Sequence, residues 1–360
     1  MVPLPASAVP SQPATQADAA SYPRLLADIG GTNARFGWLQ APGASVAHVQ
    51  RLTVPAFAGP AQAAQAYLAS LELQLGADYR APRHAAFAVA TAVAGDRIAF
   101  TNSHWAFLRT DVQAALGLRS LLMLNDFESL AMSLPCLGPA QLRLHDTVPG
   151  AVPGLSGVSG MPCVEAGTLA VVGPGTGLGV GAVLATRSGW VALPGEGGHA
   201  TLAPADALES ALLACVRRQY AHVSAERLLS GIGLPLLHQS LAEVQGRPVD
   251  ALSAAQIVDQ GGAGSDALCS QTLDVFCALL GGFAGNVALT LGARGGLYIG
   301  GGIVPRFADR FFASAFRQRF EAKGRFSNYL AAIPTALITD TLAALTGAAL
   351  AIEQQVALRS

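Results

Sequence analysis

Charged side chains are scarce in this chain of 360 residues: Asp, Glu, Lys and Arg make up 12% of it, and the net charge is −1. Lys and Arg total 22 against 23 Asp and Glu, so no excess of positive charge predicts a surface for nucleic acid or anionic lipid. The five cysteines form no C-x-x-C pair. Their pattern argues against a zinc site or a redox dithiol and favours the reduced cytoplasm.

Long apolar runs without glycine are also missing, although 51% of the residues are apolar. Glycines interrupt the charge-free runs 166–186 and 275–293, so we expect buried core there and no membrane segment. Residues 1–22 contain no Lys or Arg and no continuous apolar stretch, which does not fit a signal peptide. We expect this segment to be a disordered tail.

Short apolar runs alternate with Ala/Leu-rich helical stretches from residue 22 onward, which predicts an α/β fold. The length is sufficient for two domains. We predict helices at 61–75 and 204–218, and buried strands at 24–27, 85–90, 121–124, 168–172 and 296–299.

The predicted organisation places two α/β lobes after the tail. The small lobe covers 23–136 and is completed by a C-terminal helix at 340–357, and the large lobe covers 137–339. A Gly/Pro-rich stretch at 149–166 is expected to be a loop in the large lobe, and its role stays open.

One pattern occurs twice, at LLADIGGTNARFGWL and at TLAVVGPGTGLGVGAVL, and each copy predicts a strand, a Gly/Thr turn and a second strand. In the first copy, glycines that can take positive φ would let backbone N–H groups approach a phosphate, and Asp28 could hold Mg²⁺ through water. The alternative is a plain hairpin with a Gly-Gly turn. The candidate residues of this turn are Asp28, Ile29, Gly30, Gly31 and Thr32.

The second turn, with Gly175, Thr176 and Gly177, is followed by another predicted strand, whereas a dinucleotide fingerprint requires a helix. No G-x-x-x-x-G-K-[ST] sequence occurs, which excludes a P-loop. A third cluster, with Gly301, precedes Pro305 and a predicted helix, and could accept the adenosine end of a nucleotide.

Polar residues suited to acid–base chemistry follow the strand 121–124. Asp126 is the predicted general base, because a carboxylate can orient a sugar hydroxyl and accept its proton; the alternative is that Asp126 caps the following helix. Glu196 and His199 lie on a glycine-rich loop that could present them to a polyol, or could be a solvated turn. Ser224 is predicted to open a helix in which Glu226 complements the dipole.

Seven motifs in one order, ADIGGTN, LNDFESLAMSLP, GPGTGLGVG, LPGEGGH, SAERLLSG, GGIVPRF and KGRF, resemble the bacterial glucokinases of the proteobacterial type. The resemblance implies a two-lobed α/β fold of the actin-like ATPase (ribonuclease H-like) class with a central cleft, ATP and Mg²⁺ as co-substrate and cofactor, and a homodimer. It assigns the catalytic base to Asp126, phosphate binding to 28–32 and 175–177, and the sugar ligands to Asn125, Glu196, His199 and Glu226.

The expected reaction is the ATP-dependent phosphorylation of glucose at O6, giving glucose 6-phosphate. The partners are then glucose and ATP, without nucleic acid or membrane. No side chain is expected to bind a metal directly. A kinase for another hexose or an amino sugar, ADP or polyphosphate as the donor, and a non-catalytic sugar sensor remain as alternatives.

Overall fold

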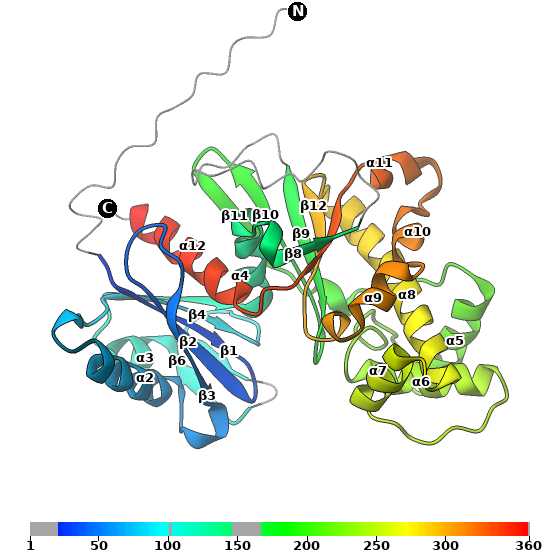
Figure 1. Ribbon diagram of the computed structural model, residues 1–360, viewed down its shortest axis with the longest axis horizontal. Coiled ribbons are helices and arrows are strands. Elements are labelled where there is room, and N and C mark those ends of the chain that lie inside the picture. The colour runs from blue at the N-terminus through cyan, green and yellow to red at the C-terminus, as the bar shows by residue number, and fades with distance from the viewer. Residues whose placement is uncertain (1–20, 101–102, 146–166, 359–360) are drawn as a thin grey trace, which may run out of the picture. The chain divides into compact units, whose positions relative to one another are not determined.

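The computed structural model describes residues 21–100, 103–145 and 167–358, which form two compact units (Figure 1). Of these residues, unit 1 holds those up to Leu124 and from Ala348 on, and unit 2 holds those from Asn125 to Gly347. The expected tail, apart from its last two residues, and the expected loop at 149–166 lie outside the described residues. The lobe boundaries at 136 and 340 remain a proposal.

Unit 1 is built on a mixed sheet. Strand β1 runs antiparallel to β2 and parallel to β4. The sheet order among the described residues is β3 (Ala47–Thr53), β2 (Asn33–Leu39), β1 (Arg24–Ile29), β4 (His84–Val89) and β7 (Ser120–Asn125). The remaining elements of this part are α2 (Pro60–Leu75), β5 (Arg97–Ala99), β6 (Ala106–Leu108) and α3 (Arg109–Ala115).

Aromatic packing and the part of the C-terminal helix from Ala348 on contribute to unit 1. Tyr67 of α2 stacks on Phe36 of β2, with ring centroids 5.5 Å apart. Glu353 of α12 (Ala343–Ala357) accepts hydrogen bonds from the Tyr22 hydroxyl and the Gly43 N–H, at 2.6 and 3.1 Å. The strands predicted at 24–27, 85–90 and 121–124 and the helix predicted at 61–75 are confirmed.

Unit 2 is built on a second mixed sheet, in which the described strands lie in the order β11, β10, β9, β12, β13, β8. The strands β9 and β10 form the predicted second hairpin, with Leu178 opposite Pro174. The strands predicted at 168–172 and 296–299 are also confirmed. The bounds are β8 (Leu142–Leu144), β9 (Thr168–Pro174), β10 (Leu178–Thr186), β11 (Gly189–Leu193), β12 (Gly296–Ile299) and β13 (Thr335–Ile338).

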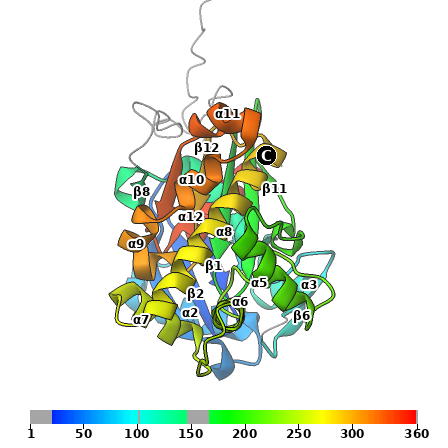
Figure 2. The same cartoon turned by 90° about the vertical axis from the view of Figure 1, so that its right-hand side faces the viewer.

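Helices enclose the core of unit 2, and α8 lies in their midst (Figure 2). Within the described residues α8 is the one helix long and apolar enough to cross a membrane. However, 72% of its most apolar stretch is buried inside the protein, which agrees with the buried core expected at 275–293. The helices are α4 (Asp126–Ser133), α5 (Ala207–Arg217), α6 (Gly233–Val244), α7 (Ala254–Ala263), α8 (Ala267–Leu291), α9 (Ala308–Ala313), α10 (Phe316–Glu321) and α11 (Ser327–Ala331).

The helix expected after Pro305 is interrupted. A short 3₁₀ helix, η7 (Val304–Phe307), leads into α9, and α10 follows separately. Ser314 has an extended backbone, and its hydroxyl accepts from the Phe316 N–H, which gives α10 a new start. Side-chain hydrogen bonding of this kind competes with helix continuation.

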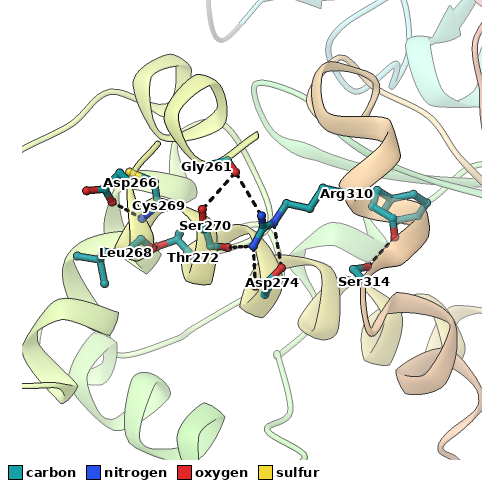
Figure 3. A network of polar contacts seen from close by, with 10 residues as sticks. Gly261, Asp266, Leu268, Cys269, Ser270, Thr272, Asp274, Arg310 and Ser314 are labelled. Atoms are coloured by element: carbon teal, nitrogen blue, oxygen red, sulfur yellow. Dashed lines mark hydrogen bonds and ion pairs between the residues drawn. The ribbon is translucent and has the colours of Figure 1, made fainter. Parts of the chain in front are cut away.

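Arg310 of α9 connects three helices of unit 2 (Figure 3). Its guanidinium makes a bidentate pair with Asp274 of α8, at 3.0 and 2.7 Å, and donates to the Ser270 carbonyl at 2.9 Å. A longer hydrogen bond of 3.4 Å reaches the Gly261 carbonyl of α7. The planar donor array of arginine suits such a junction and holds α9 beside α7 and α8.

Candidate active site

The turn between β9 and β10 is closed by backbone hydrogen bonds. The Gly175 N–H donates to the Gly177 carbonyl, and the Gly231 N–H donates to the Gly175 carbonyl, both at 2.8 Å. Thr176, at the tip, is exposed. Neither Gly175 nor Gly177 has φ in the left-handed region, so positive φ is not the reason for glycine here.

Glycine is needed at 177 because a side chain there would overlap a neighbouring residue. A Cβ on this residue would overlap Oε2 of Glu226, and the same oxygen accepts a hydrogen bond of 2.9 Å from the Leu178 N–H. A Cβ on Gly175 would meet no protein atom within 4 Å. The turn therefore needs glycine at 177 for a neighbouring carboxylate, whereas at 175 its backbone is open to a ligand.

The loop that carries Glu196 and His199 packs on the same hairpin. Gly198 lies in a short 3₁₀ helix, η6 (Gly197–His199), and a Cβ there would overlap the Leu178 carbonyl. The His199 side chain is 60% exposed and has Nδ1 3.9 Å from Oε1 of Glu226. Glu196 is exposed as well, so the loop presents polar groups beside the turn.

The helix predicted from Ser224 is wrong. Ser224 pairs with Thr201 in an isolated β-bridge, and the N–H groups of Ala225 and Glu226 donate to the carbonyls of Ala200 and Gly198, at 2.9 Å each. Only single turns form after them: the Leu228 and Leu229 N–H groups donate to the Ala225 carbonyl at 3.2 and 2.8 Å, and the segment does not continue as a helix. Helix α6 begins only at Gly233.

Asn125 and Asp126 lie at the start of α4, both half-buried. Asn125 is the N-cap: its Oδ1 accepts from the Phe127 N–H at 2.9 Å, and Glu128 completes a capping box by accepting from the Asn125 N–H at 3.2 Å. Asp126 is the first helical residue and not the N-cap, but its Oδ1 also accepts from the Phe127 N–H at 3.0 Å, so the alternative in which Asp126 caps the helix is confirmed in part. Burial raises the pKa of the Glu128 carboxyl.

The helix α4 sits directly on the glycine-rich hairpin. A Cβ on Gly173 or Gly179 would overlap the Phe127 ring, and one on Gly181 would lie 2.6 Å from the Phe127 carbonyl oxygen. Glycine on β9 and β10 thus permits the backbone of α4 to approach the sheet closely. Asp126 is therefore adjacent in sequence to a side chain that packs on the strands flanking the turn.

The third glycine cluster lies against the same turn. Gly301 has φ +78°, a conformation that favours glycine, and a Cβ there would overlap the Pro174 carbonyl. The Ile303 N–H donates to that carbonyl at 3.3 Å. Unit 2 thus brings Gly301, the 175–177 turn, the start of α4, the Glu196 loop and Glu226 into one contiguous region.

Unit 1 carries the other predicted turn, at 28–32. Ile29 is buried, and the Gly30 N–H closes the hairpin on the Asn33 carbonyl at 2.9 Å. Gly30 is not left-handed either. Asp28 pairs with Arg35 at 3.1 Å; burial raises the pKa of this carboxyl although the guanidinium opposes the shift. Gly31 and the exposed Thr32 complete the turn.

A protein-built metal cage is not found in the part of the chain that the structure describes, because no group of three His, Cys, Asp or Glu side chains converges there. Mg²⁺ does not require such a cage, since it keeps several waters and is commonly held by one or two carboxylates and substrate phosphates. Asp28, at the end of a strand and beside the glycine turn, fits that limited role.

The contacts of three residues near the two turns were not predicted from the sequence. Gly231 lies within the SAERLLSG motif, so its donation to the turn could have been suspected. Arg35, the partner of Asp28, lies on the next strand opposite it and could have been found from hairpin register. Nothing in the local pattern indicates that Phe127 packs on glycines 46 and more residues away.

Known proteins resemble this chain in sequence and in fold. The sequence pattern of the glucokinase family matches residues 25–355. A glucokinase of Chromobacterium violaceum is 46% identical over 340 residues, covering 94% of this chain and 92% of the relative. The solved glucokinase of an Antarctic psychrotroph has a TM-score of 0.80 at 34% identity, covering 92% and 98% of the two chains.

A more distant structure shares the fold. The ROK family glucokinase from Streptomyces griseus, solved with glucose and AMPPNP, has a TM-score of 0.59 at 17% identity and covers 92% of this chain and 100% of its own. Together these likenesses confirm the predicted α/β fold of the actin-like ATPase class.

Proposed function

The chain belongs to the glucokinase family, and from that premise we propose how it phosphorylates glucose with ATP: Asp126 is the general base and O6 is the acceptor. The O6–phosphorus bond forms, the bond between the γ-phosphorus and the β–γ bridging oxygen breaks, ADP leaves, and the O6 proton passes to Asp126. A sugar hydroxyl is a weak nucleophile in water, so a positioned carboxylate contributes by orienting it and accepting the proton.

The observation that carries this proposal is the contact of α4 with the hairpin of the phosphate turn. Phe127 packs on Gly173 and Gly179, and Asp126 precedes it at the helix start. A base at this helix start would be held by the same hairpin whose turn offers backbone N–H groups to the γ-phosphoryl group. The Phe127 N–H donates to both Asn125 and Asp126, at 2.9 and 3.0 Å, so the start of the helix does not depend on the Asp126 carboxylate alone.

The remaining roles follow from the match of these residues to the motifs of the family and, for Gly301, from the glycine cluster before a helix. Asn125, Glu196, His199 and Glu226 are the proposed sugar ligands. Phosphate binding is assigned to 28–32 and 175–177, and the adenosine side to Gly301. Mg²⁺, when bound with ATP, would supply positive charge against the phosphates, with Asp28 holding it through water.

The wider setting is proposed from composition and family. Near balance of acidic and basic residues agrees with small-molecule substrates and no nucleic acid or membrane partner. A cytoplasmic location agrees with the sparse cysteines. A homodimer is expected from the family and is tested by sedimentation equilibrium.

Sugar dependence is the first test. ADP release is measured with ATP and MgCl₂ against glucose, mannose, fructose, glucosamine and N-acetylglucosamine. We expect the highest kcat/KM with glucose, and ATP hydrolysis without sugar slower by at least about 10³-fold, because an acceptor hydroxyl must be held in line for transfer. A higher kcat/KM with another sugar would reassign the substrate, and no turnover with any sugar would contradict the proposal.

Two alanine substitutions separate the roles of glycine in the turn. Gly175→Ala meets no protein atom, so we expect unchanged thermal unfolding. We expect a KM for ATP raised about tenfold, because the added methyl group occupies space in which the phosphates would approach the backbone. Gly177→Ala displaces Glu226 and should raise KM for both ATP and glucose. Steady-state kinetics with each substrate varied in turn distinguishes them; an unchanged KM for ATP in Gly175→Ala would contradict a phosphate contact there.

A further inference from the structure

The Glu226 carboxylate faces two parts of the proposed site at once. Its Oε2 accepts from the Leu178 N–H at 2.9 Å, at the end of the phosphate turn, and its Oε1 lies 3.9 Å from Nδ1 of His199, on the sugar loop. We propose that Glu226 is a positioning residue for the phosphate turn and thereby couples nucleotide binding to sugar binding. The inference rests on the proposed function and adds a second role to a sugar ligand.

The backbone around Glu226 holds the carboxylate in this position. The Glu226 N–H donates to the Gly198 carbonyl at 2.9 Å, and the Ser230 hydroxyl donates to the Glu226 carbonyl at 2.7 Å. A few residues on, the Gly231 N–H donates to the Gly175 carbonyl at 2.8 Å. The segment 226–231 is therefore joined to the sugar loop at one end and to the phosphate turn at the other.

The space around the carboxylate is reserved for it. A side chain at 177 would overlap Oε2 of Glu226. The Glu226 side chain is 32% exposed, so it is not closed off from a ligand although Oε2 is bonded to the turn. A carboxylate can accept several hydrogen bonds, so sugar hydroxyls and the Leu178 N–H need not compete.

The Glu226 carboxylate affects the affinity for ATP in two opposite ways. Its negative charge near the turn repels phosphates, whereas its hydrogen bond orders the backbone that binds them. A comparison of two uncharged replacements isolates the second effect. Glu226→Gln keeps an oxygen that can accept from the Leu178 N–H, while Glu226→Met keeps the length of the side chain and removes the acceptor.

The experiment measures the Kd of AMPPNP with MgCl₂ by isothermal titration calorimetry in the absence of sugar. We expect Glu226→Met to bind AMPPNP about five- to tenfold more weakly than Glu226→Gln, the effect of one lost hydrogen bond. The matched pair Glu196→Gln and Glu196→Met should show equal Kd values, because Glu196 lies on the sugar loop without a contact to the turn among those described. A general loss of folding would not produce this contrast.

The effect of each ligand on the affinity for the other is a second measurement. Wild-type enzyme should bind AMPPNP more tightly with saturating glucose, and glucose more tightly with saturating AMPPNP by the same factor, since linkage is reciprocal. Should Glu226→Met fail to fold, Glu226→Ala takes its place in the comparison. Equal AMPPNP affinities for the Gln variant and the variant without an acceptor overturn this inference alone, whereas a wild type that binds no AMPPNP, with or without glucose, overturns the proposed function too.

Discussion

Replacing Asp126 with Asn is expected to lower kcat for glucose phosphorylation by about 10²- to 10⁴-fold, the usual contribution of a general base. The amide can still hydrogen-bond the O6 hydroxyl but cannot accept its proton. Because Asn125 is the N-cap and Glu128 completes the capping box, the substitution leaves the start of α4 intact. The Kd of glucose should therefore change by no more than a few-fold.

The measurement is kcat from ADP release together with glucose affinity by calorimetry. Glu128→Gln is the matched control on the same helical turn, because Gln at the third helical position also supports a capping box. We expect it to retain kcat within about threefold. Full activity of Asp126→Asn would exclude Asp126 as the base, and equal losses in both variants would point to damage of the helix start.

Replacing Gly179 with Ala is expected to destabilise unit 2 by about 2 kcal/mol, because a Cβ there overlaps the Phe127 ring and the helix must move away from the sheet. For a unit of this size the loss corresponds to a decrease in Tm of about 4 to 8 °C. Displacement of α4 should also lower kcat, since Asp126 precedes Phe127.

Differential scanning calorimetry and kinetics on the same samples test this expectation. A double-mutant cycle with Phe127→Ala supplies the control, because without the ring the Cβ at 179 has room and the cost of Gly179→Ala should fall. Additive losses in the double variant would show that overlap with Phe127 is not the cause.

Strands and hairpins could be predicted because their signals are local. Apolar runs such as 24–27 and 168–172 end in glycine-rich turns, and both hairpins form there. The helix at 224 was wrong: only single turns form there, and the N–H groups of Ala225 and Glu226 bond to the carbonyls of residues 200 and 198. A local pattern cannot indicate that distant carbonyls will satisfy these groups.

The site, too, has features that follow from local sequence and features that depend on distant segments. The motif order by itself determined the family, and with it the fold, and the hydrophobic pattern determined the strands around each glycine turn. Only the tertiary structure decided that Gly177 leaves room for Glu226, and that Gly173 and Gly179 leave room for Phe127. The physical reason is that a glycine in the sequence shows where a side chain is missing, whereas the atom that fills that space is brought there by packing between segments far apart in the chain.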